Sequence, residues 1–295
     1  MLTSIGCGWM RKPFAACCPS AVVAALVGAC GTSLAAESHQ LVWADEFDQA
    51  GPPDPQNWTF EHGFVRNDEL QWYQPANARC DGGRLVIEAR REHVANPQHD
   101  PDSRRWGHRR PQADYSSASL TTRGRHQWLY GRMVIRGRID TRPGLWPAFW
   151  TLGSARRWPG CGEIDVMEYY DGKLLANAAW LGGRGRPAWD SVDRPLASFD
   201  DKDWSNKFHD WRMDWDQDRI KLYVDDELMN EIDVAAAVNS DDQRTSPFRE
   251  PHYLILNLAV GGTRGGDPSG TEFPARFEVD YVRVYQPLPA VSEAE

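Results

Sequence analysis

Three acidic residues stand within six positions of one apolar segment, GEIDVMEYY: Glu163, Asp165 and Glu168. The apolar and aromatic residues around them are typical of a buried strand, whose side chains alternate between its two faces. Glu163 and Asp165 therefore share a face, whereas strict alternation would turn Glu168 toward the apolar side, where an unpaired carboxylate is costly. We predict a β-bulge near Val166 and Met167 that returns Glu168 to the face of the other two acids.

Carboxylates this close repel one another, so their pKa values should separate and one of them should stay protonated near neutral pH. A retaining glycosidase needs this combination, because it uses one ionised carboxylate as nucleophile and one carboxylic acid to protonate the leaving oxygen. The same spacing could also belong to a solvated strand face or a calcium site. Nearby indole rings favour the glycosidase interpretation, since they suit the apolar faces of sugars: Trp146, Trp150 and Trp158.

Over about 245 residues the chain resembles the laminarinase and lichenase group of glycoside hydrolase family 16. The resemblance implies that Glu163 is the nucleophile, that Asp165 positions and tunes it, and that Glu168 is the general acid and then the general base. The motifs that carry it are LVWADEF (41–47), NDELQWY (67–73), DGGRLVIEAR (81–90), YGRMVIRGRI (130–139), GLWPAFWTLG (144–153), GEIDVMEYY (162–170), FHDWRMDW (208–215), IKLYVDD (220–226), LILNLAVGG (254–262) and FEVDYVRVYQ (277–286).

The resemblance also implies residues that contact sugar. NDELQWY borders the cleft in the family, so Asn67, Glu69 and Trp72 are candidates. Laminarinase-like members usually carry a histidine on the strand after the acids, but this chain reads ANAAWL at 176–181. Asn177, as a hydrogen-bonding amide, and Trp180, as a stacking platform, would take over part of that surface. The missing histidine weakens the choice of β-1,3-glucan over other β-glycans.

Family members often hold a structural calcium on the face away from the cleft. The matching positions are Glu46, the backbone carbonyl of Gly83, and Asp280. Oxygen ligands suit this hard cation. Each acid could equally be a surface charge, so a structural calcium and an empty position remain alternatives, and no cofactor is expected for catalysis.

Short β-rich runs separated by Gly, Pro, Asn and Asp fill the chain from 41 to 286, and long helical patterns are absent. This predicts an all-β fold, a sandwich or jelly roll, in a single domain over 37–287. The family resemblance implies that this domain is catalytic and is a β-sandwich jelly roll of the concanavalin-like kind. Residues 288–295 read as a disordered acidic tail. The formal net charge of −9 disfavours nucleic-acid binding. The expected partner is a polysaccharide substrate, and the expected oligomeric state is a monomer.

Residues 1–36 read as an export leader. Arg11 and Lys12 precede an apolar run at 21–29 that is too short for a transmembrane helix. The sequence VGAC (27–30) resembles a lipoprotein cleavage box, whereas SLA (33–35) suits an ordinary signal peptidase, so a lipid anchor and a freely exported protein remain alternatives. The domain itself contains Cys80 and Cys161, which could pair or remain free buried thiols.

The sequence thus predicts an exported, endo-acting retaining glycosidase of β-1,3-linked or mixed-linked β-glucan. Three alternatives stay open: a hydrolase of another β-glycan such as a galactan, a transglycosylase that uses the same acids, and a non-catalytic glycan-binding jelly roll. The third alternative explains the acids poorly, because a binding module gains nothing from confining their repulsion to one strand.

Overall fold

Seventeen strands dominate residues 39–288, which are the residues that the computed structural model describes. The one α-helix in this range is the single turn α1 (Gly262–Gly265), so the all-β prediction is confirmed. No helix in the same range is long and apolar enough to cross a membrane. The predicted leader and nearly all of the predicted tail lie outside the described residues.

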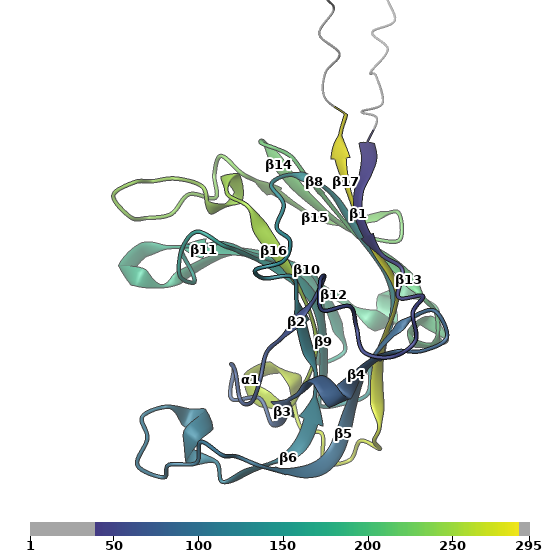
Figure 1. Cartoon of the computed structure of the whole chain (residues 1–295). Coiled ribbons are helices and arrows are strands. Elements are labelled where there is room, and N and C mark those ends of the chain that lie inside the picture. The colour runs from purple at the N-terminus through teal and green to yellow at the C-terminus, as the bar shows by residue number, and fades with distance from the viewer. Residues whose placement is uncertain (1–38, 289–295) are drawn as a thin grey trace, which may run out of the picture. The chain divides into compact units, whose positions relative to one another are not determined.

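The strands form two sheets that stack face to face (Figure 1). The first sheet has the order β15 (Glu227–Asp233), β14 (Arg219–Val224), β13 (His209–Trp215), β8 (Gly131–Ile139), β17 (Ala275–Pro287), β5 (Leu85–Ala95), β6 (Gln112–Ser117) and β3 (Gln71–Tyr73), with β1 (His39–Asp45) on β17 and β4 (Ala78–Cys80) on β5. The second sheet has the order β12 (Pro187–Pro195), β11 (Lys173–Leu181), β10 (Glu163–Tyr170), β9 (Leu145–Gly153), β16 (His252–Val260), β7 (Ser119–Thr121) and β2 (Thr59–Phe60). Short 3-10 turns connect some of them: Pro75–Asn77, Trp106–Arg109, Gly183–Gly185, Leu196–Phe199, Trp204–Asn206 and Pro247–Arg249.

One hydrophobic core fills the space between the sheets. Alternate residues of β8, among them Met133 and Ile135, face this core, and Phe149 and Ile164 of the second sheet belong to the same buried cluster. Burial of such side chains supplies most of the driving force for folding. The opposite face of the second sheet is therefore available for polar residues, and this face carries the acids of β10.

The predicted bulge lies in β10. Asp165 pairs with Asn177 of β11 and Glu168 pairs with Leu175, so two residues of β10 stand opposite one residue of β11. On the other side the register also shifts, between Asp165 and Met167. The extra residue restores the phase of the strand, which places Glu168 on the face of Glu163 and Asp165.

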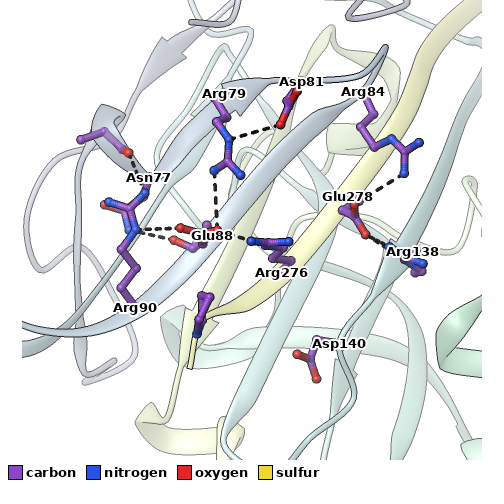
Figure 2. Close-up of polar contacts among 12 residues, drawn as sticks. Asn77, Arg79, Asp81, Arg84, Glu88, Arg90, Arg138, Asp140, Arg276 and Glu278 are labelled. Carbon is purple, nitrogen blue, oxygen red and sulfur yellow. Dashed lines mark hydrogen bonds and ion pairs between the residues drawn. The ribbon is translucent and has the colours of Figure 1, made fainter. Parts of the chain in front are cut away.

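On the outer face of the first sheet, arginines surround two largely buried glutamates (Figure 2). Glu88 accepts hydrogen bonds from Arg90 and Arg276, and Glu278 is paired with Arg138. These pairs satisfy the acids where β5, β17 and β8 lie side by side. Both carboxylates thus form ion pairs with arginines.

The polar stretch from 93 to 114 joins β5 to β6 and is held against the body of the protein by side-chain contacts. β5 continues to Ala95, and after a 3-10 turn the guanidinium of Arg110 lies over the rings of Phe64 and Trp106. Arg110 also donates hydrogen bonds to the carbonyl oxygens of Glu69 (2.7 Å) and Asp68 (3.1 Å). The stretch is therefore fastened to the segment that contains the predicted sugar contacts.

Candidate active site

The acids of β10 lie on rows of residues that run across the second sheet. Glu163 stands between Leu152 of β9 and Ala179 of β11, and Ala179 in turn pairs with Trp189 of β12. The rows of Asp165 and Glu168 follow in the same register. In order from β9 to β12 they are Trp150, Asp165, Asn177 and Ser191, and then Ala148, Glu168, Leu175 and Asp193.

These rows line an open cleft of about 960 Å³. Six of the predicted sugar-binding residues line it together with the three acids: Asn67, Glu69, Trp146, Trp150, Trp158 and Asn177. The size and the mixture of indoles with polar groups are typical of a ligand site. The structure thus brings the predicted acids and most of the predicted sugar contacts into one cavity.

Glu168 is held by two neighbours within the cleft. The indole Nε1 of Trp146 donates a hydrogen bond to one carboxylate oxygen of Glu168 (2.7 Å), and the amide of Asn177 donates to the other (3.3 Å). The same amide approaches Asp165, which is only 3% exposed, at 3.4 Å. Asn177 therefore bridges two of the three acids, in the place where the sequence led us to expect a hydrogen-bonding amide.

Glu163 contacts different groups. Trp158, which is 49% exposed at the edge of the cleft, hydrogen-bonds to its carboxylate. The guanidinium of Arg66 acts on Glu163 electrostatically and lies over the ring of Trp150, 5.0 Å from its centroid. Arg66 is itself paired with Glu61. A fixed positive charge thus faces Glu163 and favours its ionised form.

Burial raises the pKa of every acid in the trio. It raises the pKa of Glu163 and of Glu168 to about 7, and it raises the pKa of Asp165 well above its ordinary range. Repulsion from the neighbouring acids adds to burial for Glu163 and Asp165. The trio therefore retains protons near neutral pH, as a general acid requires.

Removal of the bridging amide is expected to slow catalysis. We expect Asn177→Ala to lower kcat by roughly 10- to 100-fold, because hydrogen bonds to charged groups contribute about 1.5 to 3 kcal/mol. Asn177→Asp keeps the size but adds a fourth carboxylate, so its kcat should fall further. Steady-state kinetics with a thermal unfolding check measure both; wild-type kcat in Asn177→Ala would show that the bridge does nothing for the reaction.

Replacement of Arg66 should change the pH dependence of activity. In Arg66→Met the cation that lowers the pKa of Glu163 is gone, so the acidic limb of kcat/KM should move to higher pH by about 1 unit. Arg66→Lys keeps the charge and should leave the limb close to its wild-type position. Identical acidic limbs in Arg66→Met and wild type would exclude an electrostatic role for this residue.

Two predicted sugar contacts, Trp72 and Trp180, do not line the cleft. Gln71 and Tyr73 of β3 face the interior, so Trp72 points the other way and packs against Phe64. Trp180 has the opposite phase to Asn177 on β11 and packs on the hydrophobic core, with its ring edge toward Phe248. Both placements follow from the alternation of side chains along β3 and β11.

The calcium prediction does not fit the residues that the structure places there. Both carboxylate oxygens of Glu46 accept hydrogen bonds from Arg283, at 2.8 Å each, and Asp280 is paired with Arg136 at 3.4 Å. Two of the three expected ligands thus already have cationic partners. Within residues 39–288 no group of three acidic, histidine or cysteine side chains is arranged to hold a metal ion.

Cys80 and Cys161 are free and buried, which agrees with the unpaired alternative. Burial raises the pKa of each thiol to about 11. The thiols are therefore protonated and unreactive at neutral pH.

Several residues of the cleft were not predicted from the sequence, among them Arg66, Trp189 and Arg264. Arg264 lies in the glycine-rich turn α1, which was expected from the sequence to be a turn at the cleft, although Arg264 itself was not named as a site residue. Gly262 has a φ of +76°, and a Cβ there would lie 2.7 Å from the carbonyl oxygen of Asn67. Thr263 donates a backbone hydrogen bond to that same oxygen (2.8 Å). The close approach that only glycine allows thus joins α1 to the Asn67 segment.

Sequence comparisons with known proteins identify the family of this chain. A sequence model described as "Glycosyl hydrolases family 16" matches residues 71–283. A β-glucanase of Rhodothermus marinus is 38% identical over 270 residues, which cover 84% of this chain and 85% of that protein.

The structure is also similar to solved structures of glycoside hydrolases. The laminarinase catalytic domain from Thermotoga maritima has a TM-score of 0.71 at 34% identity and covers 86% of this chain and 100% of that one. A structure from work on endo-acting O-glycanases, with which members of the human gut microbiota initiate mucin breakdown, has a TM-score of 0.77 at 35% identity and covers 84% and 91%. The chain therefore belongs to glycosyl hydrolases family 16, a family of retaining glycoside hydrolases that need no cofactor for catalysis.

Proposed function

We propose that the protein is an endo-acting hydrolase of β-1,3-linked or mixed-linked β-glucan. The observation that carries the proposal is that three carboxylates of one strand, Glu163, Asp165 and Glu168, lie together on the floor of an open, indole-lined cleft. An open cleft suits internal attack on a long chain. The β-glucanase and laminarinase relatives support β-glucan as the substrate.

In the proposed mechanism Glu163 attacks the anomeric carbon while Glu168 gives its proton to the departing sugar oxygen. Glu168 then removes a proton from water, which releases the product with retention of configuration. The raised pKa of Asp165 means that this residue adds no second negative charge beside Glu163. Trp158 and Arg66 favour the charge on Glu163, and Trp146 orients Glu168 for proton transfer.

Release of reducing ends by the purified protein tests the proposal. The substrates are laminarin, lichenan, carboxymethyl-cellulose, agarose, keratan sulfate and gastric mucin, with the Glu163→Gln variant alongside. Hydrolysis of laminarin or lichenan that the variant lacks supports the proposal. Redistribution of chain lengths without new reducing ends would indicate a transglycosylase, and binding without any reaction would indicate a glycan-binding module.

A second candidate is the hydrolysis of β-linkages in mucin or keratan sulfate. The O-glycanase structure favours it, because its TM-score of 0.77 exceeds the 0.71 of the laminarinase domain. Asn177, in place of the histidine that laminarinase-like members carry, points the same way. Activity confined to mucin or keratan sulfate in the same panel would replace β-glucan with this class of substrate.

We further propose that the protein is exported, through the leader at 1–36, and acts as a monomer. The basic pair Arg11 and Lys12 followed by an apolar run supports export. Mass spectrometry of the mature protein distinguishes a lipidated N-terminal Cys30 from an unmodified residue after Ala35 or Ala36. Recovery of the intact leader in the cytoplasm would contradict export, and size-exclusion chromatography tests the monomer.

A further inference from the structure

Trp189 is a large apolar side chain that lies exposed at the wall of the cleft. It lies on β12, and 47% of its surface is accessible. Six large hydrophobic residues within residues 39–288 are at least 40% exposed; two of them are tryptophans, Trp158 and Trp189, and both line the cleft. The ring of Trp189 has neither a hydrogen bond nor an aromatic partner among these residues. An exposed indole without a partner at the wall of a binding cleft is available to a ligand.

The sheet register places Trp189 at a defined distance from the acids. Trp189 pairs with Ala179 of β11, and Ala179 pairs with Glu163 of β10. Neighbouring strands lie about 4.8 Å apart, so the backbone of Trp189 is about 10 Å from that of Glu163. This separation is comparable to the length of two linked pyranose rings. A polysaccharide that crosses the strands at Glu163 would therefore pass Trp189.

Polar groups flank the exposed indole on the same face of β12. Ser191 and Asp193 follow Trp189 at every second position and also line the cleft. Lys173 of β11 is paired with Asp193 at 2.8 Å, which holds the carboxylate in place. An apolar platform with hydroxyl, carboxylate and ammonium groups beside it matches a sugar ring, which has an apolar face and a polar rim.

We propose that Trp189 forms a distal sugar subsite, in which its indole stacks on a pyranose about two units from the bond that is cleaved. The ligand is an internal unit of a long β-linked hexopyranose chain. This inference rests on the proposed function, because it assumes that the chain lies across Glu163. Trp189 thus makes the enzyme prefer long chains, whereas substrates too short to reach β12 do not use it.

The test compares chain lengths in Trp189→Ala, Trp189→Phe and wild type, with laminarin and laminari-oligosaccharides of increasing length as probes. Trp189→Ala is expected to raise KM for laminarin about tenfold and to leave the kinetics on the shortest cleaved oligosaccharide unchanged. Trp189→Phe keeps an aromatic face and should recover part of the affinity. Leu41→Ala, which changes an equally exposed residue of the first sheet, is the control and should match wild type.

Binding is measured independently of turnover, by affinity electrophoresis in gels containing laminarin or gastric mucin. Weaker retardation of Trp189→Ala in the gel that retards wild type supports the subsite, even where no polymer is hydrolysed and the proposed function fails. Hydrolysis by wild type together with unchanged KM and unchanged retardation in Trp189→Ala would overturn the subsite and leave the proposed function intact. Equal losses on short and long substrates would also overturn it, and so would the absence of retardation of wild type in both gels.

Discussion

Glu163→Gln is expected to lower kcat by at least about 10³-fold while the protein remains folded. Glutamine is nearly isosteric with glutamate but is a very poor nucleophile, so the glycosyl-enzyme intermediate cannot form at a useful rate. The residue lies at the floor of the cleft, where Trp158 and Arg66 favour its ionised form. Steady-state kinetics on the best polymer of the panel, together with circular dichroism, measure the effect.

The matched control is Glu88→Gln. Glu88 is a buried glutamate of the first sheet, on the outer face that Figure 2 shows, and it is bound by Arg90 and Arg276. The same change of residue type there should leave kcat within about twofold, because Glu88 and its arginine partners lie outside the cleft and contact no substrate. Retention of most of the activity in Glu163→Gln would remove this residue from the reaction.

The same substitution is expected to increase stability at high pH. Burial, and then the charge of Glu168, raise the pKa of Glu163 to about 7 from an ordinary value of 4.5. A folded-state pKa above the unfolded one gives stability that is present below pH 4.5 and is lost as the pH rises toward 7. Glutamine does not ionise, so Glu163→Gln should be more stable than wild type by roughly 1 to 2 kcal/mol at pH 8, and equally stable at pH 4.

Glu88→Gln should show the opposite sign. Burial alone would raise the pKa of Glu88, but hydrogen bonds from Arg90 and Arg276 outweigh it and lower the pKa. A lowered folded-state pKa gives stability that is present above the unfolded pKa and is lost as the pH falls. Denaturant unfolding across this pH range measures both variants. A Glu163→Gln protein that is less stable than wild type at pH 8 would contradict the view that the ionised carboxylate of Glu163 destabilises the folded protein.

The β-bulge of the catalytic strand could be predicted from the sequence, because a bulge is the simplest way to keep all three acids out of the hydrophobic core. Alternation would bury Glu168 in the core beside Ile164, and an extra residue at Val166 avoids this cost. The fold class followed from the same short-range pattern of strands and turns. These predictions depend on neighbours in the sequence, and the structure confirms them.

Predictions that depend on contacts between distant segments succeeded less often. Glu46 could not be recognised as a partner of Arg283, because 237 positions separate the two residues. Arg66 likewise reaches the cleft only because its loop lies over Trp150 of β9. Trp189 stands in an edge strand whose alternation is visible in the sequence, but only the register of β10, β11 and β12 places it in the row of Glu163.

The central claim is that Glu163 forms a covalent glycosyl-enzyme intermediate. The most direct measurement incubates the protein with an activated 2-deoxy-2-fluoro glycoside of its preferred sugar, which slows release of the intermediate, and maps the labelled peptide by mass spectrometry. The account predicts one glycosyl unit, attached to Glu163, in a peptide that also contains Glu168. A label on Glu168 instead, or an unlabelled protein whose first-formed product has inverted configuration, would contradict it.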